Sequence, residues 1–274
     1  MIYTTQFIIL DISNNVSTSC ALPKWPVAGE GGKLGGKSWK SAVETLLKLT
    51  STFPMAILLG RAGMGKSQVA FEVCKRVDCI YIDMTELNEK NLANIAAVIA
   101  WRLLTQGLPE AKNRLIEAYR KFGYEGVLSL AKSDPTWTLR TALELSPGRR
   151  VVLLDELLPS AEDPKFFELA YILHRIRNMH LPNVSFLVTM LPEVYEKIVE
   201  KIPPLGNFFI HITVQLPDVI PEEELDEIVA LYCPERVELA RKIYRERPDL
   251  TVRELLIELN HMPARKYVEL TPID

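Results

Sequence analysis

Residues 60–67 read GRAGMGKS, which fits the pattern GxxxxGK(S/T) of a glycine-rich loop that binds phosphate. Glycines let such a loop adopt positive φ, so that successive backbone N–H groups point at phosphate oxygens. Lys66 would reach the β- and γ-phosphates of a nucleotide, and the Ser67 hydroxyl would bind Mg²⁺. A glycine turn without a ligand is disfavoured, because an apolar run precedes the loop and a helical pattern follows it. The predicted phosphate-binding residues are Gly60, Arg61, Ala62, Gly63, Met64, Gly65, Lys66, Ser67 and Gln68.

Two carboxylates, Asp155 and Glu156, end the apolar run VVLL. Such a run predicts a buried parallel strand, and ligands of open α/β sheets bind where the strands end. Asp155 would hold Mg²⁺, usually through water, and Glu156 would polarise a water for attack on the γ-phosphate. The pair indicates hydrolysis of the nucleotide in addition to binding. The alternative is a solvated acidic turn.

The elements that would position these residues alternate along the chain. Short apolar runs predict strands at 55–60, 79–84, 149–157, 184–190 and 208–216. Helical patterns lie between them at 38–53, 65–77, 88–104 and 163–180, with Ser38 and Asn88 as expected N-caps. This alternation predicts βαβ units and an α/β fold of three layers, with a mostly parallel five-stranded sheet between helices.

Three regions are expected. Residues 1–36 would form an N-terminal strand and a glycine-rich loop, and residues 37–217 the core. Within the core, 107–148 reads as a helical insertion of three short helices, which either cover the sheet or bind a partner. Residues 218–274 read as a small helical domain behind a proline-flanked hinge.

Composition excludes several classes. The net charge of −3 gives no global basic field for nucleic acid, and no apolar run is long enough for a membrane span. Four scattered cysteines without a CxxC pair predict free thiols and a cytoplasmic protein. No NKxD motif supports a GTPase, and the acidic start of the C-terminal region argues against the arginine-rich lid of a small-molecule kinase.

The glycine loop, the strand VVLLDEL and Thr189 at the end of VSFLVTM resemble the AAA+ and STAND classes of P-loop ATPases. The segment CIYIDMTELN, together with VVLLDEL, is similar to the archaeal ATPase family that lies between these classes. The resemblance covers about residues 38–270. It implies strand order 5-1-4-3-2, a helical lid after the last strand, and the cofactors ATP and Mg²⁺.

The resemblance also implies roles for two further residues. It places Thr189 at the sensor-1 position, where it would contact the γ-phosphate or the attacking water; a strand-end threonine with a satisfied hydroxyl is the alternative. The segment NHMPARKYVEL is similar to a sensor-2 segment, which would make Arg265 a contact to the γ-phosphate. The alternatives for this segment are a surface arginine, or a helix-turn-helix over 251–270 that reads DNA.

The chain departs from the AAA+ pattern in one respect: no arginine occurs between Arg177 and Arg236, where a trans-acting arginine finger is expected. Either Arg175 or Arg177 takes that part, or the protein does not act as a ring. Two hypotheses follow. One is an ATP hydrolase that couples nucleotide state to lid movement in a DNA transaction such as replication or loading. The other is a STAND-type switch with slow turnover that acts through protein partners, with nucleotide-dependent homo-oligomers.

Overall fold

The computed structural model describes residues 33–87, 89–107, 113–145, 148–181 and 183–261, so nearly all of the predicted N-terminal strand and loop lies outside it. The described residues form one sheet of five parallel strands: β1 Met55–Leu59, β2 Cys79–Asp83, β3 Arg150–Asp155, β4 Val184–Met190 and β5 Thr213–Gln215. Their order is β2-β3-β4-β1-β5, which is the predicted 5-1-4-3-2 read from the opposite edge.

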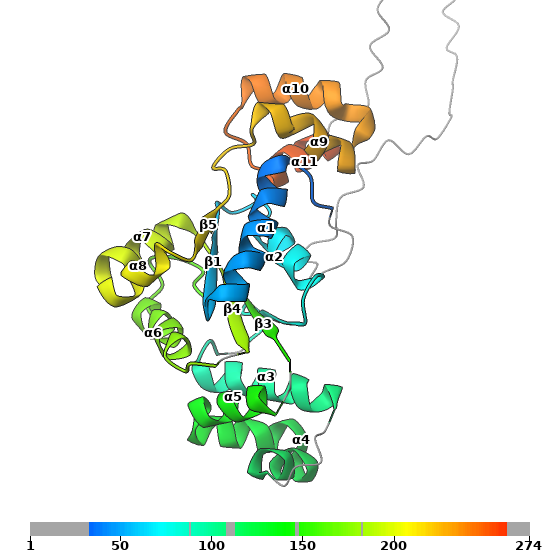
Figure 1. The fold of residues 1–274 in the computed structure, drawn as a ribbon. Helices are drawn as coiled ribbons and strands as arrows, with labels where there is room; N and C mark the ends of the chain where they lie inside the picture. The colour runs from blue at the N-terminus through cyan, green and yellow to red at the C-terminus, as the bar shows by residue number, and fades with distance from the viewer. Residues whose placement is uncertain (1–32, 88, 108–112, 146–147, 182, 262–274) are drawn as a thin grey trace, which may run out of the picture.

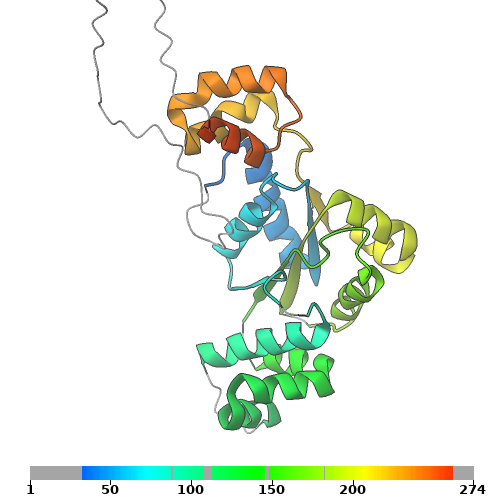
Figure 2. The same ribbon diagram turned by 180° about the vertical axis from the view of Figure 1, so that it is seen from behind.

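Helices cover both faces of this sheet (Figures 1 and 2), as the predicted three-layer fold requires. Along β1, Met55 and Ile57 pack on one face and Ala56 and Leu58 on the other, because successive side chains of a strand alternate. The second face is covered by α1 Lys37–Thr52 and α2 Lys66–Cys74. The first is covered by α3 Leu92–Gln106, α5 Pro135–Glu144, α6 Phe166–Arg177, α7 Pro192–Lys201 and α8 Pro203–Phe209.

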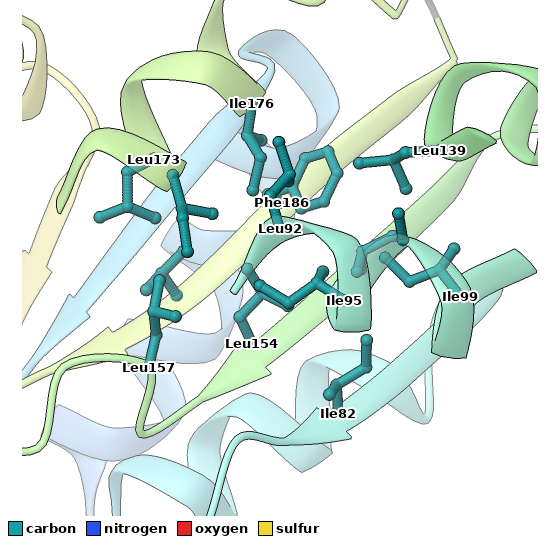
Figure 3. Packing of buried hydrophobic residues seen from close by; sticks show 14 of the residues in the cluster. Ile82, Leu92, Ile95, Ile99, Leu139, Leu154, Leu157, Leu173, Ile176 and Phe186 are labelled. Atoms are coloured by element: carbon teal, nitrogen blue, oxygen red, sulfur yellow. The ribbon is translucent and has the colours of Figure 1, made fainter. Parts of the chain in front are cut away.

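Figure 3 shows the larger of the two cores, between β2, β3 and β4 and the helices of the first face. Ile95 and Ile99 on α3 are fully buried, and so are Leu139 on α5 and Leu173 on α6. They pack over Ile82, Leu154 and Phe186 of the sheet. The apolar spacing of these helices therefore holds them against the strands whose ends carry the candidate site.

The insertion 107–148 contains α4 Arg114–Ser133 and α5. Gly123, with φ 59° and ψ −137°, interrupts α4, so the segment bends near where two short helices were expected. α5 covers the sheet through Leu139, whereas α4 packs on α3 and α5 at the end of the molecule farthest from the C-terminal helices (Figure 1).

Three local predictions are wrong. The strand expected at 208–216 is helical at its start, because Phe208 and Phe209 belong to α8, and a short apolar run fits either structure. Gly36 is the N-cap of α1, while the amide and hydroxyl of Ser38 donate to the Glu224 carboxylate at 2.9 and 2.5 Å. α3 begins later than predicted, with Asn91 rather than Asn88 as its N-cap.

The expectation of free thiols is also wrong: none of the cysteines in the described part of the chain is free, and Cys74 and Cys79 form a disulfide with each other. Cys74 ends α2 and Cys79 begins β2, and the short turn between them leaves their Cα atoms 5.1 Å apart, within the usual range for a disulfide.

Beyond β5 lie α9 Glu222–Tyr232, the 3-10 turn η1 Pro234–Arg236, α10 Val237–Glu246 and α11 Val252–His261. Figures 1 and 2 show these helices gathered at one end of the molecule, beside the start of α1. Leu225, Ile228 and Leu255 are buried in the same cluster as Trp39 of α1. We call the residues from α9 to α11 the lid, after the helical lid that the resemblance implies. None of the helices in the described ranges has the length and apolarity that crossing a membrane requires.

Candidate functional site

The glycine-rich loop joins the end of β1 to the start of α2, which begins at Lys66. Gly63 and Gly65 have φ of 84° and 86°, a conformation that suits glycine. A Cβ atom on Gly63 would also lie 2.7 Å from Thr251 Oγ1 of the lid. The loop thus leads directly into the N-terminus of α2, where backbone N–H groups of a helix can bind an anion.

Lys66 turns its side chain back over this loop. Its Nζ donates to the carbonyl oxygens of Gly60 at 2.7 Å and Arg61 at 3.1 Å. Burial lowers the pKa of Lys66; the negative charges of Asp155 and Glu156 oppose this, and the positive charge of Arg253 adds to it. The Lys66 ammonium group thus lies close enough to two carboxylates and one guanidinium to feel their charges.

The two carboxylates lie at the end of β3, and Thr189 lies near the end of the neighbouring strand β4. Asp155 is buried, and its carboxylate accepts a hydrogen bond from the Thr189 hydroxyl. The same hydroxyl accepts from the backbone N–H of Glu156 at 3.1 Å. Glu156 has φ 58°, an uncommon conformation for this residue type, and its side chain is exposed. The turn after β3 therefore leaves the Asp155 carboxylate buried and the Glu156 carboxylate exposed.

The residues present fit a magnesium ion with nucleotide phosphates. Ser67 offers a hydroxyl and Asp155 a carboxylate, and Mg²⁺ binds through one or two carboxylates, waters and substrate phosphates. In the described part of the chain, no group of three or more His, Cys, Asp or Glu side chains could hold a metal by itself. Ser67 and Asp155 would hold the ion together with the phosphates.

A pocket of about 270 Å³ gathers most of the predicted residues. Those that line it are Ala62, Gly63, Met64, Gly65, Lys66, Ser67, Gln68, Glu156 and Thr189. Gly60 and Asp155 are buried and do not line it. Arg61 points away, because its guanidinium donates to the carbonyl oxygens of Asp218 at 2.9 Å and Asp249 at 3.4 Å. Arg265 lies outside the described residues.

The same pocket is also lined by residues that the sequence motifs did not predict. Leu34, Ile228 and Leu256 add apolar surface of the kind that holds a planar ring. Tyr232 ties the segment before α1 to α9, since its hydroxyl donates to the Lys33 carbonyl at 2.6 Å and accepts from the Lys33 N–H at 3.1 Å. No motif marks these residues, which come together only when the lid packs on the core.

Arg253 is the other missed residue, and it enters the pocket from the start of α11. Its backbone N–H donates to the Gly63 carbonyl at 3.1 Å, so the first turn of α11 rests on the glycine-rich loop. Thr251 and Glu254 make a reciprocal capping box at this end, with the Thr251 N–H donating to Glu254 at 2.8 Å. The sequence TVRE, with Thr251 followed three residues later by Glu254, is typical of a helix start.

No model of a known protein family matches the chain, and no curated protein matches it. Solved structures do. The Aeropyrum pernix ORC2 protein in ADPNP–ADP complexes is similar with a TM-score of 0.56 at 18% identity, over 86% of this chain and 64% of that one. The A. pernix ORC1 protein in complex with DNA is similar with a TM-score of 0.53 at 17% identity, over 82% of this chain and 59% of that one. The chain therefore has the fold of these two proteins.

At these identities the likeness concerns the fold, and it confirms the predicted class of α/β sheet. This chain spans less than two thirds of the length of either similar structure. The roles of the individual side chains are therefore argued from the pocket itself.

Proposed function

We propose that this chain binds ATP with Mg²⁺ and hydrolyses it. The observation that supports this most strongly is that the glycine-rich loop, Glu156, Thr189 and Arg253 line one pocket. Apolar side chains for the base and the cationic side chains of Lys66 and Arg253 for the phosphates suit a nucleoside triphosphate.

In the proposed mechanism, Lys66 and the loop amides bind the β- and γ-phosphates. Ser67 and Asp155 would hold Mg²⁺, directly or through water, and the bound ion would neutralise phosphate charge. Glu156 orients a water and accepts its proton as the oxygen attacks the γ-phosphorus and the bond to ADP breaks. Thr189 keeps Asp155 and the Glu156 backbone in place through its two hydrogen bonds.

We further propose that nucleotide state changes the position of the lid. The contacts that support this join the loop to α11 and to the chain before it: Gly63 to the Arg253 N–H, and Arg61 to the Asp249 carbonyl. A loop that rearranges around phosphate would alter both contacts. α11 would then move with the nucleotide, which favours the lid interpretation of its residues over a DNA-reading helix.

A DNA transaction such as replication or loading is the proposed setting. The support is the fold shared with the ORC1 protein in complex with DNA and the ORC2 protein in ADPNP–ADP complexes. The proposed partners are ATP and ADP, DNA or a protein partner, and further copies of this chain, in the cytoplasm.

One observation favours the STAND-type switch as a second candidate. Arg177 is occupied within the chain, because its guanidinium donates to the Pro204 carbonyl at 2.8 Å and lies 4.6 Å from the centroid of the Phe208 ring. Of the two arginines considered for a trans-acting finger, this leaves Arg175, which is exposed on α6. A protein without such a finger would turn over slowly and act through its nucleotide-bound state.

The deciding experiment measures ATP turnover with Mg²⁺, with and without DNA, alongside the oligomeric state in each nucleotide condition. DNA-stimulated turnover supports the first candidate, and nucleotide-dependent self-association with negligible turnover supports the second.

Lys66→Ala is expected to abolish nucleotide binding, whereas Glu156→Gln is expected to bind ATP and lose hydrolysis. Wild-type turnover by Glu156→Gln would contradict the role assigned to that carboxylate.

A further inference from the structure

Tyr81 lies beside the buried carboxylate of the site. Tyr81 is on the edge strand β2, two residues before Asp83, which pairs with Asp155 in the parallel register. Its hydroxyl reaches Asp155 Oδ2 at 3.5 Å, while Thr189 donates to Oδ1 of the same carboxylate. Each oxygen of Asp155 thus faces one hydroxyl, from strands on opposite sides of β3.

The Tyr81 ring is itself held in place. It packs against Phe71 of α2 with ring centroids 4.6 Å apart, and its backbone carbonyl accepts a hydrogen bond from the Arg102 guanidinium. Phe71 lies one helical turn after Ser67, so Tyr81 contacts the helix that carries the other proposed metal ligand. The pair of aromatic rings thus links the strand beside Asp155 to the helix that carries Ser67.

The hydroxyl is a donor in this setting. The phenol O–H donates to Asp155 Oδ2, because a carboxylate oxygen can only accept.

We propose that Tyr81 is a positioning residue for Asp155, which sets the affinity of the nucleotide complex for Mg²⁺. This rests on the proposed function. A carboxylate that faces a hydroxyl at each oxygen has less freedom to rotate before the metal arrives, and hydrogen bonds to metal ligands orient them. Tyr81 would touch neither the phosphates nor the attacking water.

The test is Tyr81→Phe, which keeps the ring and its packing and removes only the hydroxyl. Affinity for a fluorescent ATP analogue is measured in EDTA and then across a Mg²⁺ titration, with ATPase activity followed over the same titration. The concentration of Mg²⁺ at half-effect should rise roughly threefold to tenfold in both readouts, as the loss of one hydrogen bond implies. Binding in EDTA should not change. Tyr119→Phe is the matched control, because the Tyr119 hydroxyl lies on α4 and no hydrogen bond of it occurs in the described part of the chain.

Two results would overturn the inference while the proposed function stands: a wild-type Mg²⁺ dependence in Tyr81→Phe, or an equal loss of binding with and without Mg²⁺, which would make Tyr81 a structural residue only. A wild-type protein that binds no nucleotide, or binds it without any effect of Mg²⁺, would instead overturn the proposed function and this inference with it.

Discussion

The Thr189 hydroxyl donates to the carboxylate of Asp155 and accepts from the backbone N–H of Glu156 at 3.1 Å. One buried side chain on β4 thereby fixes both residues of the acidic pair that ends β3. Either role considered for Thr189, a contact to the γ-phosphate or a satisfied strand-end hydroxyl, must be compatible with these two bonds.

Thr189→Val should destabilise the protein and slow hydrolysis. Valine keeps the shape of the side chain but leaves the Glu156 N–H without its acceptor and Asp155 Oδ1 without its donor, at a cost of about 1–3 kcal/mol. Urea unfolding measures the free energy change, and steady-state ATPase assays measure turnover. Thr189→Ser should retain most of both properties. Thr45→Val, on the exposed face of α1, should change neither; an unaltered Thr189→Val protein would show that the two hydrogen bonds are dispensable.

Glu156→Gly should make the folded protein more stable while it abolishes hydrolysis. The residue holds φ 58°, and a left-handed conformation costs a residue with a Cβ roughly 1–2 kcal/mol, which glycine avoids. Part of the gain is lost because glycine is more flexible when unfolded, so a net gain of about 0.5–1 kcal/mol is expected in thermal or urea unfolding.

His180→Gly is the matched control, because His180 is the other described non-glycine residue with positive φ, at 49°. It should gain stability without losing ATPase activity. If Glu156→Gly instead loses stability, the backbone at this turn is not strained, and its conformation is no sign of a site that trades stability for activity.

Local patterns predicted the central architecture well, because buried parallel strands and the loop between β1 and α2 have strong signatures. The strand order was implied by the resemblance rather than by any local pattern. The region 208–216 was predicted poorly, since Phe208 and Phe209 belong to an apolar run that suits either a strand or a helix. Its structure depends on packing: Phe209 is fully buried, and Tyr195 of α7 stacks on it.

The residues of the candidate site were likewise predicted only in part. Lys66, Ser67 and Glu156 were predicted because their motifs are contiguous in sequence. Arg253 and Tyr232 were not, because their relation to the pocket depends on how the lid folds back over the core. The disulfide between Cys74 and Cys79 was missed for a similar reason, since composition does not reveal that a helix end and a strand start are neighbours.

Lys66 should make the stability of the ligand-free protein depend on alkaline pH. Burial lowers its pKa in the folded chain below the ordinary 10.5, so between the two values the unfolded chain binds more protons and the free energy of unfolding rises with pH. Below the pKa that Lys66 has in the folded chain, its buried ammonium group lowers the free energy of unfolding. Lys66→Met should therefore remove this part of the rise, as measured by urea unfolding from pH 7 to 10. Lys48→Met, on the exposed face of α1, should leave the pH profile unchanged; an identical profile for Lys66→Met would contradict the burial argument.

Arg253→Ala should weaken ATP binding more than ADP binding. Arg253 lines the pocket, and its charge already acts on Lys66, so it stands where a γ-phosphate beside Lys66 would meet a second cation. Loss of a charge-assisted contact to that phosphate predicts roughly a tenfold or larger fall in ATP affinity, with a smaller change for ADP. Calorimetric titration with each nucleotide measures the difference. Arg245→Ala removes the same charge from α10 and serves as the control.

Arg265→Ala, tested in the same titrations, separates the two arginines of the C-terminal region. If Arg265 holds the γ-phosphate as the sensor-2 resemblance implies, its variant will lose ATP affinity and Arg253→Ala will not. Equal losses would mean that both side chains reach the phosphate. Equal affinities of Arg253→Ala and the wild type for ATP would instead leave Arg253 with a structural part only, through its backbone contact to Gly63.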